Sequence, residues 1–300
     1  MGKRQGWGRV INFQEILIER FVQDLKMDYH PNFSGMKPEY TRILEHTARL
    51  VLGKIANSDN LYHDVEHTVN ATLVGMNILK GKRLMGVEVT PLDGVHYILA
   101  LLCHDIGYVR GVCRADQPGK YATGRDGQTV TIDDDWTDSA LTPYHVDRSK
   151  RFVTEHLGNG QQGDFLDSAV IAEYIEMTRF PIPEDAYYQD TSGYAGLVRA
   201  ADFIGQLGDP NYLRKIPALF YEFEESGVNK TVGYQSPGHM RRAFKLFYGE
   251  VVLPYIGDAI QYMNASPEGK QWIVNLYTHL RKVEQDLIAS RGDHNLNNFE

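Results

Sequence analysis

Three separated segments of the chain carry side chains that can bind a divalent metal ion. Residues 62–67 read Tyr-His-Asp-Val-Glu-His, residues 103–107 read Cys-His-Asp-Ile-Gly, and Asp202 stands in a third segment. Imidazoles and carboxylates are the usual ligands of hard to borderline divalent ions. A lone His-Asp dipeptide would carry little information, but three such segments, each of helical character, predict a metal-dependent hydrolase.

The spacing of these residues restricts how they can meet. The two histidines of the first segment are four residues apart and would share one face of a helix. His104 and Asp105 point about 100° apart on a helix, so both can reach one ion only near a helix end. Gly107 fits such an end, and Asp202 would come from a later helix packed against the first two. One imidazole with His104, Asp105 and Asp202 would leave open positions for water, as catalytic sites require.

This pattern resembles the HD-domain metal-dependent phosphohydrolases. The order His…His-Asp…Asp is theirs, and residues 62–67 look especially like the Tyr-His-Asn-x-x-His element of the cyclic-nucleotide phosphodiesterase branch. The resemblance covers residues 62–205. It implies an HD-type helical fold and a phosphoester hydrolase that acts on a nucleotide or another small phosphorylated compound.

The resemblance also implies roles for individual residues. His67, His104, Asp105 and Asp202 would be metal ligands, and Asp105 could bridge two ions. His63 corresponds to the histidine that protonates the leaving oxygen, which suits an imidazole whose pKa is near ~6.5. Water activated by the metal would be the nucleophile.

A second metal ion would need further ligands between residues 105 and 202. His145 is the best candidate, and Glu176 or Glu173 could supply the last ligand. The sequence leaves open whether one or two ions bind, and whether they are Zn, Mn, Mg, Fe, Co or Ni.

Other charged residues have weaker assignments. Asp64 or Glu66 could orient the ring of His63. Arg179 and Arg199 could each bind a phosphate group as a fork of donors, or could instead form ordinary salt bridges.

Two departures from the phosphodiesterase branch disfavour a cyclic nucleotide. Gly107 and Tyr108 stand where that branch has a second Asp and a third His, and no glutamine after Asp202 has a phenylalanine three residues later. The form His-Asp-Ile-Gly is common in broader HD and HD-GYP proteins, but the GYP signature is absent. Two alternatives stay open: a non-catalytic HD module that binds a nucleotide or a partner, and a di-iron oxygenase on the same scaffold.

The elements that must position these residues are predicted to be helices. Apolar residues recur at helical spacing over residues 13–25, 40–55, 64–82, 91–104, 144–157, 166–179, 192–207, 210–226, 237–263 and 267–289. Residues 108–142 break the pattern, and an Asp-Gly turn predicts a small β-hairpin near 121–132. This insertion could be a lid or a plain surface excursion. We expect residues 1–300 to form one all-α domain, with a flexible polar tail at 291–300.

Composition restricts the partners. The net charge of −8 and the pI of about 5.8 argue against a nucleic-acid polymer and against an anionic membrane surface. No signal peptide and no apolar stretch long enough to span a bilayer are visible. Two cysteines, Cys103 and Cys113, give no disulfide framework, which favours a cytoplasmic protein. We therefore expect a small phosphorylated substrate as partner, with a homo-oligomer left open.

Overall fold

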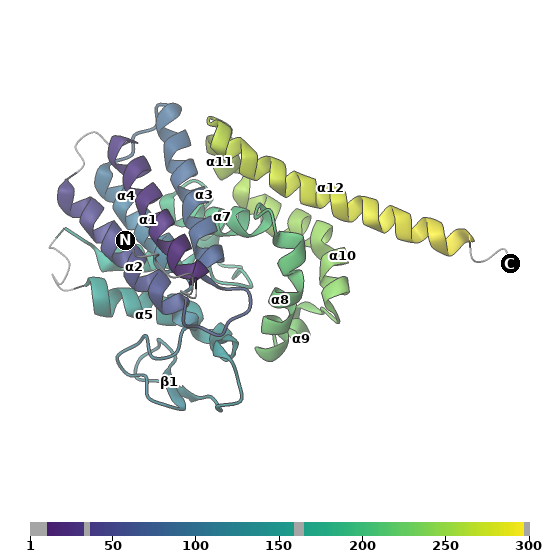
Figure 1. Ribbon diagram of the computed structural model, residues 1–300, viewed down its shortest axis with the longest axis horizontal. Coiled ribbons are helices and arrows are strands. Elements are labelled where there is room, and N and C mark those ends of the chain that lie inside the picture. Colours follow the sequence, from purple (N-terminus) through teal and green to yellow (C-terminus); the bar gives the residue numbers. More distant parts are fainter. Residues whose placement is uncertain (1–10, 33–36, 159–164, 297–300) are drawn as a thin grey trace, which may run out of the picture.

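The computed structural model describes residues 11–32, 37–158 and 165–296, and helices dominate these parts of the chain (Figure 1). The first half contains α1 (Phe13–Asn32), α2 (Pro38–Ile55), α3 (Val65–Leu84), α4 (Pro91–Cys103) and α5 (His145–Leu157). The second half contains α6 (Ser168–Glu176), α7 (Tyr194–Leu207), α8 (Tyr212–Glu225), α9 (Val228–Val232), α10 (Pro237–Phe247), α11 (Leu253–Met263) and α12 (Pro267–Leu296). Short helical turns are η1 (Ile106–Tyr108), η2 (Asp138–Tyr144), η3 (Ala186–Gln189) and η4 (Tyr248–Val252). The predicted all-α fold is confirmed.

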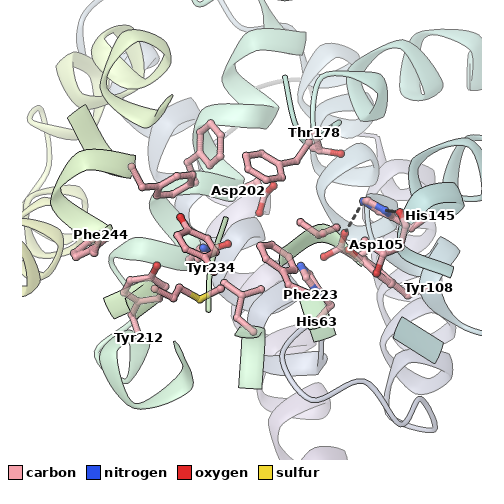
Figure 2. Close-up of a pocket in the computed structure, with 18 residues that line it drawn as sticks. His63, Asp105, Tyr108, His145, Thr178, Asp202, Tyr212, Phe223, Tyr234 and Phe244 are labelled. Atoms are coloured by element: carbon pink, nitrogen blue, oxygen red, sulfur yellow. Dashed lines mark hydrogen bonds and ion pairs between the residues drawn. The ribbon is translucent and has the colours of Figure 1, made fainter. Parts of the chain in front are cut away.

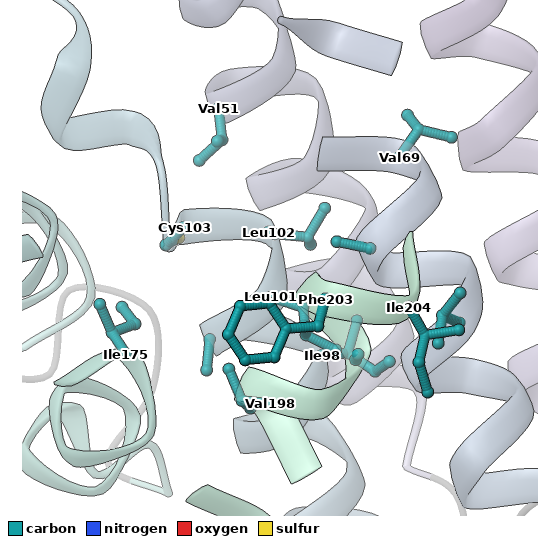
Figure 3. Packing of buried hydrophobic residues seen from close by; sticks show 14 of the residues in the cluster. Val51, Val69, Ile98, Leu101, Leu102, Cys103, Ile175, Val198, Phe203 and Ile204 are labelled. Atoms are coloured by element: carbon teal, nitrogen blue, oxygen red, sulfur yellow. The ribbon is translucent and has the colours of Figure 1, made fainter. Parts of the chain in front are cut away.

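Helix α4 is the central element of the core. Pro91 starts it, and the Thr90 hydroxyl caps it by accepting the N–H of Asp93 at 3.1 Å. Its side chains from Val95 to Cys103 are all buried. A helix that is apolar on every side must be surrounded by other elements, and α2, α3, α6 and α7 pack around it (Figure 3). Its last turn therefore delivers the His-Asp dipeptide into the interior.

Helices α3 and α7 cross at very close range. A Cβ added to Gly205 would lie 2.7 Å from the Cα of Ala71, so only glycine permits this approach. His67 lies one turn before Ala71, and Asp202 lies one turn before Gly205. The close crossing therefore brings these two side chains together.

The predicted hairpin is confirmed. Strands β1 (Lys120–Ala122) and β2 (Thr129–Thr131) are antiparallel, with Tyr121 opposite Val130. Gly124 has φ +82° and sits so close to the backbone of Asp147 that a Cβ would overlap it. A small separate cluster of Tyr121, Ile132 and Leu141 supports the hairpin.

The C-terminal third differs from the sequence expectation in three places. The helix predicted over 237–263 is interrupted by the π-helical turn η4, just before Pro254, which has no N–H to continue the helical ladder. The short helix α9, between Gly227 (φ +80°) and Gly233 (φ +83°), was not predicted because five residues are too few to show a period. Helix α12 continues to Leu296, so the tail expected to be flexible is helical as far as it is described, and residues 297–300 lie outside the described part.

One hydrophobic cluster runs from Ile18 to Val283, so the described helices share a core. Within the described residues, every helix is too short or too polar to cross a lipid bilayer.

Candidate metal site and pocket

Four predicted ligands converge at the buried ends of three helices. The Nε2 atom of His67 lies 3.1 Å from Asp105 Oδ2 and 3.3 Å from Asp202 Oδ1. The Nε2 atom of His104 lies 3.1 Å and 3.7 Å from the same two oxygens. The two Nε2 atoms are 3.4 Å apart, so four ligand atoms surround one small volume.

The position of the His-Asp dipeptide follows the sequence expectation. Helix α4 ends at Cys103, and His104 and Asp105 occupy the bend before η1. His104 Nδ1 is 2.7 Å from the carbonyl of Leu101, which makes Nδ1 the donor and turns Nε2 toward Asp105. Metal-binding histidines are usually fixed by such a second contact.

The donor set fits a divalent cation. Asp105 Oδ2 is buried and accepts no hydrogen bond, although two imidazoles lie beside it. Buried polar atoms are rarely left unpaired, and an orphan oxygen beside two histidines and a second carboxylate is the arrangement expected where a divalent ion could bind. His67, His104, Asp105 and Asp202 are therefore the residues that could hold a metal.

The electrostatics of the site favour positive charge. Burial alone would lower the pKa of His67, but the carboxylates of Asp105 and Asp202 raise it to about 9. Burial would likewise lower the pKa of His104, and Asp105 and Asp202 raise it well above its usual value. Burial would raise the pKa of Asp105, but His104 and His67 hold it well below its usual range. The carboxylates thus stay ionised and available to a cation.

His63 lies outside the helix that carries His67. Asp64 is the N-cap of α3 and accepts the backbone N–H of His67 at 2.9 Å, so His63 precedes the helix. The expectation that both histidines share one helical face is therefore wrong, yet their ring centroids are only 5.4 Å apart. The bend before the cap turns His63 back toward the site.

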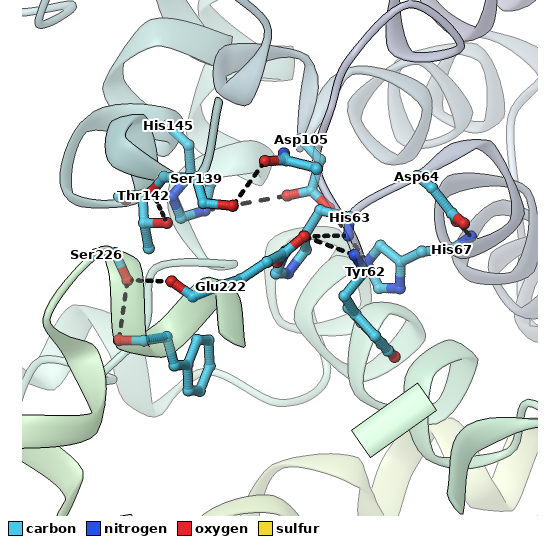
Figure 4. A network of polar contacts seen from close by, with 12 residues as sticks. Tyr62, His63, Asp64, His67, Asp105, Ser139, Thr142, His145, Glu222 and Ser226 are labelled. Atoms are coloured by element: carbon cyan, nitrogen blue, oxygen red, sulfur yellow. Dashed lines mark hydrogen bonds and ion pairs between the residues drawn. The ribbon is translucent and has the colours of Figure 1, made fainter. Parts of the chain in front are cut away.

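Glu222 on α8 orients His63, and the sequence did not identify it. One carboxylate oxygen lies 2.5 Å from His63 Nδ1, and the other accepts the backbone N–H groups of Tyr62 (2.6 Å) and His63 (3.1 Å), as Figure 4 shows. Burial would lower the pKa of His63, but the charge of Glu222 raises it. The contact with Glu222 favours the protonated form of His63.

The sequence offered Asp64 or Glu66 to orient the ring of His63, but both side chains make other contacts. Asp64 caps α3, and Glu66 is 40% exposed and pairs with Lys215 at 2.9 Å. The orienting role belongs to Glu222, which is 159 residues away in the sequence.

Tyr108 separates two imidazoles. Its ring stacks on His63, with centroids 4.5 Å apart, and on His145, with centroids 4.3 Å apart. This residue occupies the position where the phosphodiesterase branch has a histidine. Here it spaces His63 from His145 and closes one wall of the site.

His145 faces the other oxygen of Asp105. Its Nδ1 is 2.6 Å from the carbonyl of Thr142, and its Nε2 is 4.0 Å from Asp105 Oδ1. Burial lowers the pKa of His145 to about 4, so its ring is neutral near pH 7. The role of His145 as a ligand of a second ion stays a prediction.

Helix α5 locks the loop that follows Asp105. Gly107 passes so close to the carbonyl of His145 that a Cβ would overlap it. Arg148 is fully buried, donates to the carbonyls of Gly107 (2.6 Å) and Val109 (2.9 Å), and pairs with Asp116 at 2.9 Å. Arg148 was not singled out from the sequence, where it resembles any basic residue of an amphipathic helix.

The structure does not bring the glutamates of α6 to the site. Glu173 is exposed, and Glu176 pairs with Lys150 at 2.5 Å and with Arg179. Arg179 also pairs with Asp147 at 2.7 Å. Glu176 therefore sits in a salt-bridge cluster instead of the predicted second metal site, because oppositely charged side chains neutralise it there.

The two candidate phosphate-binding arginines are also engaged elsewhere. Arg179 belongs to the cluster just described. Arg199 is buried, donates to the carbonyls of Tyr188 and Asp190 at 2.7 Å each, and lies 4.0 Å from the ring centre of Tyr255. Neither arginine lines the pocket described next.

A pocket opens from the candidate metal site (Figure 2). The empty space in and around it is about 880 Å³, a figure that includes open solvent at its mouth. Its polar lining includes His63, Asp105, Tyr108, Thr142, His145, Thr178, Asp202 and Gln206. Its remaining lining is apolar or aromatic: Phe180, Phe203, Tyr212, Leu219, Phe223, Val228, Tyr234, Met240, Phe244 and Phe247.

The long insertion contributes to this pocket only through its ends. Tyr108 and Thr142 line it, whereas the residues of β1 and β2 do not. Within the described residues, the hairpin thus lies beside the pocket, and only the base of the insertion forms part of its rim.

Comparison with known proteins places the chain in a family. The comparison with curated proteins gave no match. The family described as Npun_R2479-like matches residues 11–286, which include every residue of the candidate site and pocket. Because the match spans nearly the whole chain, the protein belongs to the Npun_R2479-like family.

Proposed function

We propose that this protein is an HD-type, metal-dependent phosphohydrolase that cleaves a phosphoester of a small compound. The observation that carries the proposal is the convergence of His67, His104, Asp105 and Asp202, with an oriented histidine, His63, on the pocket side. The sequence pattern of the HD phosphohydrolases and this geometry support the same reaction class.

Different residues would bind the metal ion and donate the proton. A divalent ion held by His67, His104, Asp105 and Asp202 would activate water and neutralise phosphoryl charge. His63 lines the pocket and holds a proton with the help of Glu222, so it can donate that proton to the leaving oxygen. The Glu222 carboxylate also fixes which nitrogen of the ring faces the pocket.

The His63–Glu222 pair favours catalysis over a purely binding role. Glu222 is 1% exposed, and its contacts to His63 and to the backbone of Tyr62 and His63 offset its desolvation. A module that merely binds a ligand has no need for a buried, oriented proton donor.

The test combines metal analysis with a substrate panel. Purified protein should contain a divalent metal, and metal-supplemented protein should release phosphate from phosphomonoesters or cleave phosphodiesters. Asp202→Ala should lose both properties together. Absence of metal from wild type, after supplementation with Zn, Mn, Mg, Fe, Co and Ni in turn, would overturn the proposal.

A second candidate function follows from the apolar pocket. A di-iron oxygenase would also use this donor set and would place an apolar substrate beside it. Oxygen consumption and colour in iron-loaded protein, without phosphate release, would favour this alternative.

The number of ions can be measured directly. His145 faces one oxygen of Asp105 while His67 and His104 face the other, so Asp105 can serve two ions. Metal titration of wild type and of His145→Ala measures how many ions each protein binds. Loss of one ion in the variant assigns His145 as a ligand, and equal stoichiometry assigns it a structural role.

A further inference from the structure

The lining of the pocket becomes apolar and aromatic away from the candidate metal site. Four phenylalanines form a continuous wall along it. The ring of Phe180 lies 6.3 Å from Phe223 and 6.1 Å from Phe247, and Phe247 lies 6.4 Å from Phe203, measured between centroids. Phe203 directly follows Asp202, so the wall begins at the candidate ligands.

The far end is also aromatic. Figure 2 shows Phe244 and Tyr212 on the opposite side of the pocket from Asp105 and His145, and the two rings are 5.2 Å apart. The polar groups of this end are the hydroxyls of Tyr212 and Tyr234 and the amide of Gln206, which lies close to Tyr212. None of these side chains carries a fixed charge.

The lining has no fixed positive charge among the described residues. No lysine or arginine belongs to it, and both arginines that the sequence offered for phosphate binding are engaged elsewhere. A nucleoside would have to bury a ribose and the edges of a base against these rings, and unpaired polar groups are costly to bury. A hydrocarbon group would instead gain from the same surface.

We propose that the substrate is a single-tailed amphiphile. Its oxyanion head lies at the metal end, and an alkyl or aryl tail occupies the aromatic part of the pocket. This deepens the proposed function and rests on it for the head group, which would be the phosphomonoester of a hydrophobic alcohol. The tail assignment rests on the pocket alone.

Chelating probes test the tail without any assumption about the reaction. Straight-chain hydroxamates bind divalent metals, and their affinity for metal-loaded protein can be measured by calorimetry. Each buried methylene should tighten binding about three- to fourfold, so octanohydroxamate should bind on the order of 10³-fold more tightly than acetohydroxamate. Affinity independent of chain length would overturn the tail assignment while leaving the metal site intact.

A matched pair of variants on α10 tests whether the hydroxamate tail binds against the aromatic wall of the pocket. Phe247 lines the pocket, whereas its neighbour Leu246 is 61% exposed and does not. Phe247→Ser should weaken octanohydroxamate about tenfold or more and leave acetohydroxamate unchanged, because only the tail loses its contacts. Leu246→Ser should change neither. If Phe247→Ser does not fold, Phe223→Ser with exposed Tyr221→Ser as control repeats the comparison on α8.

Metal-free protein separates this inference from the proposed chemistry. The apolar dye Nile red should bind chelator-treated wild type, and octanohydroxamate should displace it. Displacement without any metal-dependent binding would support the tail and overturn the metal chemistry. Failure of long hydroxamates both to bind the metal-loaded protein and to displace the dye would overturn the tail.

Turnover of alkyl phosphates of different chain length tests the tail assignment with substrates. Ethyl, butyl and octyl phosphate have leaving groups of similar basicity, so differences among them report binding of the tail. Values of kcat/KM should rise with chain length, and nucleoside monophosphates should be poor substrates. A preference for nucleotides over octyl phosphate would contradict the inference while supporting hydrolysis.

Discussion

At the metal end of the pocket three imidazoles are each held by a directional contact, whereas at the far end aromatic rings are held by packing. His63 is fixed by Glu222, His104 by the carbonyl of Leu101, and His145 by the carbonyl of Thr142. Phe244 and Tyr212 at the other end simply lie against one another. The difference indicates that single substitutions should act abruptly at the metal end and gradually at the aromatic end, where rings can readjust.

The largest effect is expected from His104→Ala. The variant removes a ligand whose ring is 1% exposed, so no other group can replace it. Loss of metal affinity should exceed the ~10- to 100-fold known for residues that only support ligands, and activity should disappear with it. Elemental analysis checks this, with exposed His46→Ala as the control. Full metal content in His104→Ala would remove His104 from the ligand set.

The next effect is expected from His63→Ala. His63 lies close enough to His67 and Asp105 to share a metal ion with them, but we assign it to proton donation. Under that assignment metal content should stay at the wild-type level, while turnover of an alkyl phosphoester falls by about 10²- to 10⁴-fold. A nitrophenyl ester needs little protonation of its leaving oxygen and should lose much less. Equal losses for the two esters would exclude His63 as the proton donor.

Glu222→Gln should have a smaller effect on the same step. Glutamine keeps the shape but removes the charge that raises the pKa of His63, so turnover of alkyl esters should fall about 10- to 100-fold. The double variant with His63→Ala should be little worse than His63→Ala alone, because both act through one ring. Additive losses would show that Glu222 acts independently of His63.

Gly205→Ala tests whether the helix crossing sets the metal geometry. The new methyl group must push α7 away from Ala71, which should lower the free energy of unfolding by about 1–3 kcal/mol. Metal binding should weaken too, because His67 and Asp202 separate. Gly257→Ala, in α11 with nothing within 4 Å, should instead be neutral or stabilising by about 0.5–1 kcal/mol. Chemical denaturation and metal titration of both variants make the comparison.

The smallest functional effect is expected from Glu176→Gln, which should keep wild-type metal content. Its role is structural. Burial would raise the pKa of Glu176, but Arg179, Lys150 and Tyr188 lower it to about 2. A carboxylate with a lowered pKa stabilises the fold above its unfolded pKa of about 4.5 and loses this contribution as pH falls toward 2. The variant should therefore be less stable than wild type by about 1–3 kcal/mol at pH 7, with the gap closing between pH 4.5 and 2. A constant gap would contradict this role.

The sequence by itself predicted most of the helices and the four candidate ligands that the structure brings together, because both predictions depend on local patterns. Helical periods span whole segments, and the apolar run that ends in His104 and Asp105 predicts a buried helix that delivers them to the interior. Asp202 was expected on a later helix packed against the first two, and α7 carries it.

Tertiary structure alone decided which polar side chains support the site. Glu222 stands among Glu224 and Glu225, and nothing in that stretch distinguishes it until α8 packs against residues 62 and 63. The sequence made Glu176 and Arg179 equally suitable for the site, but in the structure these two side chains form an ion pair with each other. Side-chain pairing over long sequence distances depends on how helices pack, and a period does not encode it.

The pocket could not be predicted from the sequence either, because its walls come from segments that are far apart in the chain. Phe180, Phe223 and Phe247 come from a loop and two helices, and the sequence predicts at most that such rings are buried. Whether buried rings fill a core or line a cavity depends on how closely the helices that carry them approach. The candidate reactive groups were therefore predicted from the sequence, while the shape and polarity of the space beside them depend on tertiary packing, including that of α8 against α10.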